Sequence, residues 1–131
     1  WDLTDAIDRG DTTVSLMLLH RMMHSGERHP LQIMAILHNH YLRLLRLDGA
    51  DAHSEEAAAA VLGVKPGFQV RKAVELSRRL GSTSVQRAIE LLAQADLDLR
   101  GRRDWPDSLV MEVLVARLSR LGGGEPSRRR R

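Results

Sequence analysis

The order of apolar and polar residues predicts helices along the whole chain. Apolar residues recur at spacings of three and four, and no segment alternates apolar and polar residues over the length of a strand. Residues that favour helix starts and stops interrupt this pattern at regular points. The sequence therefore predicts an all-α fold, a compact bundle of about seven helices that forms one domain over residues 1–121.

The expected helices are defined by the residues at their ends. A glycine at position 81 is expected to separate a fifth helix from a sixth, because glycine commonly ends a helix. The expected starts and stops, in chain order, are Asp2 or Thr4 to Gly10, Asp11 to Gly26, Pro30 to Gly49, Ser54 to Gly63, Phe68 to Gly81, Ser82 or Ser84 to Arg100, and Asp104 (with Pro106 in the first turn) to Gly122.

The last predicted helix has an unusually wide apolar arc. At 100° per residue, Met111, Val115 and Leu118 widen its apolar face to roughly 200°. Arg117 falls inside the same arc, where a guanidinium needs a carboxylate or carbonyl partner. Two interpretations are open: a central helix surrounded by its own domain, or a helix that also packs on a partner subunit.

Asp96 is predicted to lie on the apolar face of the preceding helix. A buried carboxylate without a partner is unfavourable, and Arg100, four residues later, is the expected partner. This pair is interpreted either as a structural ion pair or as a contact with another subunit. Asp98 is two residues away and is expected on a different face, so the two carboxylates do not form an acid–base couple.

Composition and charge further limit the cellular location and the classes of partner that are expected. The chain has no Cys, no apolar run near the ~20 residues that span a membrane, and no signal pattern, so a cytoplasmic location is expected. The net charge of +3 resides in residues 122–131, which end in four Arg, and the rest is neutral. These ten residues are expected to form a flexible basic tail, either solvated or in contact with DNA phosphates. Because the chain begins at Trp1, we expect a fragment of a longer protein.

The usual catalytic and cofactor motifs are not found. His20 and His24 are four residues apart, but no His-Glu-x-x-His motif accompanies them, so we expect no metal site. Neither a Gly-x-Ser-x-Gly elbow nor a phosphate-binding glycine loop occurs. We therefore expect no cofactor and no enzymatic activity.

Four short motifs carry a family resemblance. They are Asp-Arg-Gly-Asp at 8–11, Arg-His-Pro-Leu at 28–31, Leu-Gly-Val-Lys-Pro-Gly-Phe at 62–68 followed by Arg-Lys-Ala at 71–73, and Ala-Asp-Leu-Asp-Leu-Arg-Gly at 95–101. In this order and spacing the chain resembles the C-terminal end of the delta subunit of bacterial DNA polymerase III. Arg100 departs from the Lys of that family but keeps the charge.

The resemblance implies a role in assembly. In that family the C-terminal helical domain belongs to the collar of the clamp loader, where it joins the tau/gamma and delta-prime subunits. The complex places the sliding clamp on DNA for the DNA-directed DNA polymerase. The sliding clamp and DNA are contacted only by the full-length protein or the complex, and the clamp-opening residues lie in an N-terminal domain. The structural or interface candidates here are Asp96, Arg100, Met111, Val115, Arg117 and Leu118.

The alternative is a helical DNA-binding regulator. A helix-turn-helix protein needs a recognition helix with side chains that read bases and phosphates. The helix at 68–80 comes closest, with Gln69, Arg71, Lys72, Arg78 and Arg79. A third interpretation, an α-solenoid scaffold, is disfavoured because no repeat of 30–45 residues is present.

Overall fold

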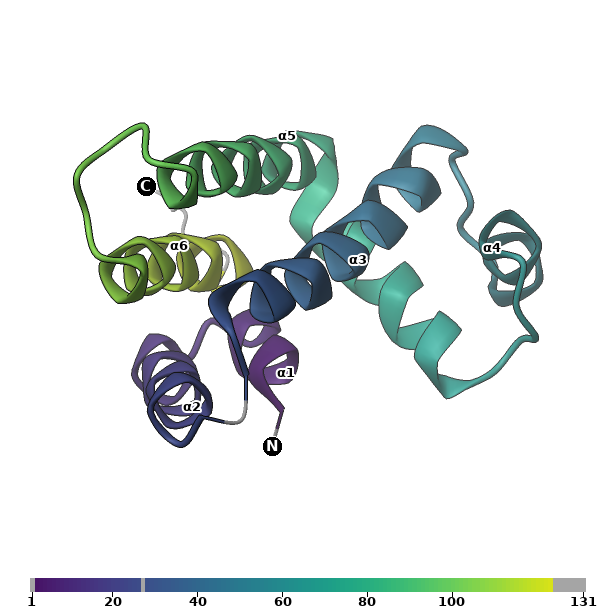
Figure 1. Ribbon diagram of the computed structural model, residues 1–131. Helices are drawn as coiled ribbons and strands as arrows, with labels where there is room; N and C mark the ends of the chain where they lie inside the picture. The colour runs from purple at the N-terminus through teal and green to yellow at the C-terminus, as the bar shows by residue number, and fades with distance from the viewer. Residues whose placement is uncertain (1, 27, 124–131) are drawn as a thin grey trace, which may run out of the picture.

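The computed structural model describes residues 2–26 and 28–123, and over these residues α-helix is the only regular secondary structure (Figure 1). This confirms the all-α prediction. The six helices are α1 (Leu3–Asp8), α2 (Thr12–His24), α3 (Pro30–Gly49), α4 (Glu55–Leu62), α5 (Phe68–Leu99) and α6 (Asp107–Gly122).

The difference between the predicted seven helices and these six lies at Gly81. This residue has φ 79° and ψ 165°, which is not helical, yet the helix continues on both sides of it. Figure 1 shows that the first part of α5, in teal, and its second part, in green, run in different directions. The predicted break is therefore a kink within one element. Ser82, an expected cap at this break, donates its hydroxyl to Asp48 on α3 at 2.7 Å.

Three of the seven predicted helix starts are confirmed by capping hydrogen bonds. The side chains of Asp2, Asp11 and Ser54 each accept a hydrogen bond from a backbone N–H in the first turn of their helix. The prediction that Asp104 caps the last helix is wrong. That helix begins at Asp107, directly after Pro106, and no side chain caps it. The fixed φ of Pro106 sets the helix start here, so no capping bond is needed to place it.

The start of α3 uses a cap that the sequence did not predict. The His29 ring nitrogen accepts from the N–H of Leu31 at 3.1 Å, and the Gln32 side chain accepts from the N–H of His29 at 3.0 Å. This reciprocal pair is a capping box, with a histidine in the place usually taken by Ser or Thr. Pro30 occupies the first turn, as predicted.

The helices enclose two cores. The larger core lies among α1, α2, α6, α3 as far as Leu44, and α5 from Leu76 onward. The smaller core lies among α3, α4 and the first part of α5, and consists of Leu47, Ala52, Ala58, Ala59, Val70 and Val74. Because α3 and α5 contribute to both cores, they join the two ends of the domain (Figure 1).

The α6 helix packs against α1, α2 and α5, which confirms the interpretation of a central helix. Its last residue, Gly122, is helical, so the predicted boundary of the tail lies inside α6. The predicted flexibility of the tail concerns residues 124–131, which lie outside the described residues. None of the helices in the described ranges combines the length and apolar content needed to cross a bilayer.

Candidate functional site

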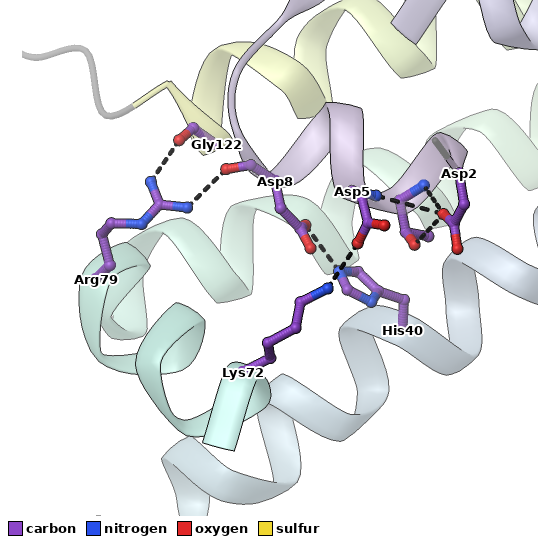
Figure 2. Close-up of polar contacts among 8 residues, drawn as sticks. Asp2, Asp5, Asp8, His40, Lys72, Arg79 and Gly122 are labelled. Atoms are coloured by element: carbon purple, nitrogen blue, oxygen red, sulfur yellow. Dashed lines mark hydrogen bonds and ion pairs between the residues drawn. The ribbon is translucent and has the colours of Figure 1, made fainter. Parts of the chain in front are cut away.

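A polar cluster ties α1 to α3, α5 and the end of α6 (Figure 2). Its members come from four helices and are joined by side-chain bonds: Asp5, Asp8, His40, Lys72, Arg79 and Gly122. Lys72 Nζ donates to Asp5 Oδ1 at 2.7 Å, and His40 Nε2 lies 2.8 Å from Asp8 Oδ1. The cluster therefore fixes α1 against two helices that are distant in sequence.

Arg79 closes this cluster at the C-terminal end of α6. Its guanidinium donates to the carbonyl oxygens of Gly122 and Asp8, each at 2.6 Å, and so joins the ends of α6 and α1 (Figure 2). The backbones approach so closely that a Cβ on Gly122 would overlap the Ile7 carbonyl oxygen. A Cβ on Gly10 would overlap the backbone of Gly123. Glycine is needed at both positions.

The charges in and beside this cluster are stabilised by their hydrogen bonds. The bond to Asp5 raises the pKa of Lys72. Burial alone would raise the pKa of Asp2, but bonds from Thr4 and from the backbone of Asp5 together lower it. The Asp2 cap thus contributes stability at neutral pH that is lost as the pH falls through its folded-state pKa. These charged side chains therefore help to hold the helices together.

An apolar groove adjoins the polar cluster along the first part of α5. Three large apolar side chains are exposed in it: Leu42 at 41%, Val64 at 53% and Phe68 at 62%. The groove is open and has a volume of about 790 Å³. Its wall follows the turn between α4 and α5, which is the 62–68 motif of the sequence. We call this surface the apolar groove.

A comparison with protein families assigns the domain. Residues 1–118 match the family model of the DNA polymerase III delta subunit, C-terminal domain. The chain belongs to this family. The match includes the apolar groove and every member of the polar cluster except Gly122. No curated protein and no solved structure gives a significant match.

Within this delta-subunit domain, Asp96 does not occupy the position predicted for it. It forms the predicted ion pair with Arg100 at 3.1 Å, but the two side chains are 37% and 73% exposed. The prediction of a buried Asp96 is therefore wrong. The buried face of this part of α5 follows Ala88, Leu91, Ala95 and Asp98, which places Asp96 about 100° away from Ala95.

Asp98 is the buried carboxylate, with a side chain only 10% exposed. The Arg102 guanidinium donates to Asp98 Oδ1 at 2.8 Å, and Arg103 Nε lies 3.7 Å from the same oxygen. This pair holds the turn after α5 against the helix. The signal for it was present in the sequence as an Asp with an Arg four residues later, a spacing that Asp96 and Arg100 share.

The predicted interface residues on α6 fall into two groups, one buried in the core and one exposed at the surface. Met111, Val115 and Leu118 are fully buried within the domain and offer no side-chain surface to a partner in this conformation. Leu114 extends this buried face, so the domain itself covers most of the wide apolar arc. Arg117 is exposed, and among the described residues it has no ion pair. The expectation that its partner comes from another subunit stays a prediction.

The basic residues of the proposed recognition helix are mostly engaged within the domain. Lys72 is bonded to Asp5, and Arg79 is bonded to two backbone carbonyls. Arg71 lies 3.2 Å from a carboxylate oxygen of Glu55. A recognition helix needs these side chains free to reach bases and phosphates. Their internal bonds disfavour the DNA-binding regulator.

The histidines are placed without a metal-binding geometry. The rings of His20 and His24 lie against each other with centroids 3.8 Å apart and an interplanar angle of 31°, and His40 belongs to the polar cluster. Within the described residues, no group of three or more His, Asp or Glu side chains is arranged to hold a metal ion.

Proposed function

We propose that this chain is a non-catalytic assembly domain of the clamp loader, which joins its collar through contacts with the tau/gamma and delta-prime subunits. The observation that carries the proposal is the family match over residues 1–118, together with the helical fold. In this role the domain contributes to loading the sliding clamp during replication. The sliding clamp and DNA are contacted only by the full-length protein or the complex.

The distribution of charged side chains supports an assembly role. In the polar cluster, carboxylates and cations pair with each other or with carbonyls, so they hold helices in place. The apolar groove, in contrast, exposes three large apolar side chains, Leu42, Val64 and Phe68, that belong to neither core of the described domain. Contiguous exposed apolar surface is typical of sites where proteins bind one another.

The proposal is tested by mixing the chain with purified tau/gamma and delta-prime collar domains. Size-exclusion chromatography with light scattering should show a complex whose mass includes this chain, and duplex DNA should bind weakly at physiological salt. If no complex forms and the chain alone binds a DNA duplex tightly and sequence-specifically, the regulator interpretation replaces this one.

A further inference from the structure

The apolar groove has a rim of a single charge sign. Its floor includes the exposed side chains of Leu42, Val64 and Phe68. The charged side chains among the described residues that line it are Arg43, Arg46 and Lys65, and no Asp or Glu is among them. The groove therefore combines an apolar floor with a basic rim.

Two of these rim cations are not directly paired, although Arg43 also lines the adjoining pocket of the polar cluster, which contains Asp5 and Asp8. The Arg46 guanidinium donates to the Val61 carbonyl at 2.5 Å and helps to hold α4 against α3. Arg43 and Lys65 are exposed, and neither has a hydrogen bond or ion pair to the side chains that the structure describes. Their positive charge is thus available to an acidic partner.

The walls of the groove determine the kind of backbone that fits. They are formed by α3, the turn after α4 and the start of α5, so they present side chains and offer no strand edge. Extended peptides that add to a sheet need such an edge, whereas an amphipathic helix binds through its apolar face alone. The groove fits a helix.

Other occupants fit this chemistry less well. Residues 122–131 of the chain itself carry four Arg and one Glu, and like charges would repel them from the rim. Single-stranded nucleic acid binds by stacking bases on successive aromatic rings. Phe68 is the only Phe of the chain, and no Tyr or Trp is among the described residues that line the groove.

We propose that the apolar groove receives an acidic amphipathic helix of a neighbouring protein. Apolar side chains of that helix cover Val64 and Phe68, and its carboxylates pair with Arg43 and Lys65. The inference rests on the proposed function for one point only, which is that the neighbour belongs to the same clamp-loader assembly.

The first test removes the apolar contact. The Val64→Ser/Phe68→Ser double variant is compared with Met17→Ser/Leu31→Ser, because Met17 and Leu31 are similarly exposed at 51% and 57% but lie on α2 and at the start of α3. Titration calorimetry against the tau/gamma or delta-prime subunit that binds the wild-type chain measures Kd. We expect the groove variant to raise Kd about tenfold or more and the control by less than about twofold.

The second test reverses the rim charge. Arg43→Glu/Lys65→Glu is compared with Arg21→Glu/Arg28→Glu, which makes the same change in net charge at exposed residues outside the groove. We expect the rim variant to weaken binding more than the control does, and the difference to shrink as salt is added. Circular dichroism of every variant verifies that the helical fold is retained.

The outcomes separate this inference from the proposed function. A wild-type complex that the groove and rim variants form equally well overturns the inference and leaves the assembly role standing. If the wild-type chain binds neither subunit, the proposed function fails and the inference fails with it. If the groove variants abolish self-association or DNA binding while subunit binding is unchanged, the occupant is a second copy or a nucleic acid, and the inference is overturned.

Discussion

The polar cluster and the apolar groove adjoin along the same segment, the first part of α5, and Arg43 and Phe68 lie at the border between them. In the polar cluster, Lys72 and Arg79 are bonded to α1 and to the end of α6. In the groove, Phe68 is exposed and Arg43 forms no ion pair within the described residues. Basic residues that line one helical segment thus differ in role according to what the fold places opposite them.

The polar cluster also explains how a short first helix is kept in place. An isolated helix as short as α1, six residues long, is not stable in water, so it depends on tertiary contacts. Asp5 and Asp8 supply polar contacts, and Leu3 and Ile7 are buried in the larger core. Neither core includes the exposed side chains of the groove, which are Leu42, Val64 and Phe68. Variants of the polar cluster and variants of these exposed side chains should therefore differ in their effect on stability.

The largest effect is expected where the backbone approach is closest. Gly10→Ala places a Cβ against the backbone of Gly123 at a residue with φ +76°. We expect it to lower the free energy of unfolding by about 2–4 kcal/mol, because strain at positive φ adds to a steric overlap. Urea denaturation measures the change.

Gly26→Ala is the matched control, since Gly26 has φ +77° but nothing within 4 Å of an added Cβ. It should lower the free energy of unfolding only by the conformational strain, about 1–2 kcal/mol. Equal losses of stability in the two variants would show that the α1–α2 turn and the end of α6 are not in close backbone contact.

The helices were largely predictable because their ends depend on local signals. Asp2, Asp11 and Ser54 cap helices as predicted, since each side chain reaches a backbone N–H within three residues. The break at Gly81 was also predicted, and the backbone there is not helical. The direction in which α5 continues after it depends on tertiary packing, because Val74 and Val85 on either side of the kink are buried against different cores.

The next effect concerns the two carboxylates near the end of α5. We expect Asp98→Ala to lower the free energy of unfolding by about 1–3 kcal/mol, because it leaves the Arg102 guanidinium without its buried acceptor. Asp96→Ala should cost less than about 0.5 kcal/mol, since its ion pair with Arg100 is exposed. Thermal unfolding of both variants measures the two changes in stability. A larger loss of stability in Asp96→Ala than in Asp98→Ala would contradict the assignment of Asp98 as the buried carboxylate.

The site was less predictable than the fold, for a physical reason. The buried face predicted for α5 lies about 100° away from its actual position. Since Asp96 and Asp98 are two residues apart, they lie on nearly opposite faces of the helix, so this error exchanged one for the other. The polar cluster joins residues such as Asp8 and Arg79 that are 71 positions apart, and no local pattern specifies that contact. The groove motif was visible at 62–68, but its exposure depends on where α4 packs.

A smaller effect is expected at Arg79. Arg79→Met removes two bonds from the carbonyl oxygens of Asp8 and Gly122, and it should cost about 1–2 kcal/mol because the site is partly exposed. Arg78→Met, one residue earlier and exposed, should change stability by less than about 0.5 kcal/mol. The hydrogen-exchange rates of the α1 amides should increase only in the Arg79 variant. Equal rates in both variants would show that Arg79 does not hold α1 in place.

The smallest effect on stability is expected in the groove, where the contrast with the polar cluster is sharpest. Val64→Ser should change the free energy of unfolding by less than about 0.5 kcal/mol, because the side chain is already 53% exposed in the folded state. Phe68→Ser also loses the contact with Lys72 Nζ, 5.7 Å from its ring centroid, which adds about 0.5 kcal/mol. Urea denaturation of the two variants beside Arg79→Met measures the contrast. If Val64→Ser destabilises the domain as much as Arg79→Met does, the groove is part of the folded core, and its exposed side chains are not reserved for a partner.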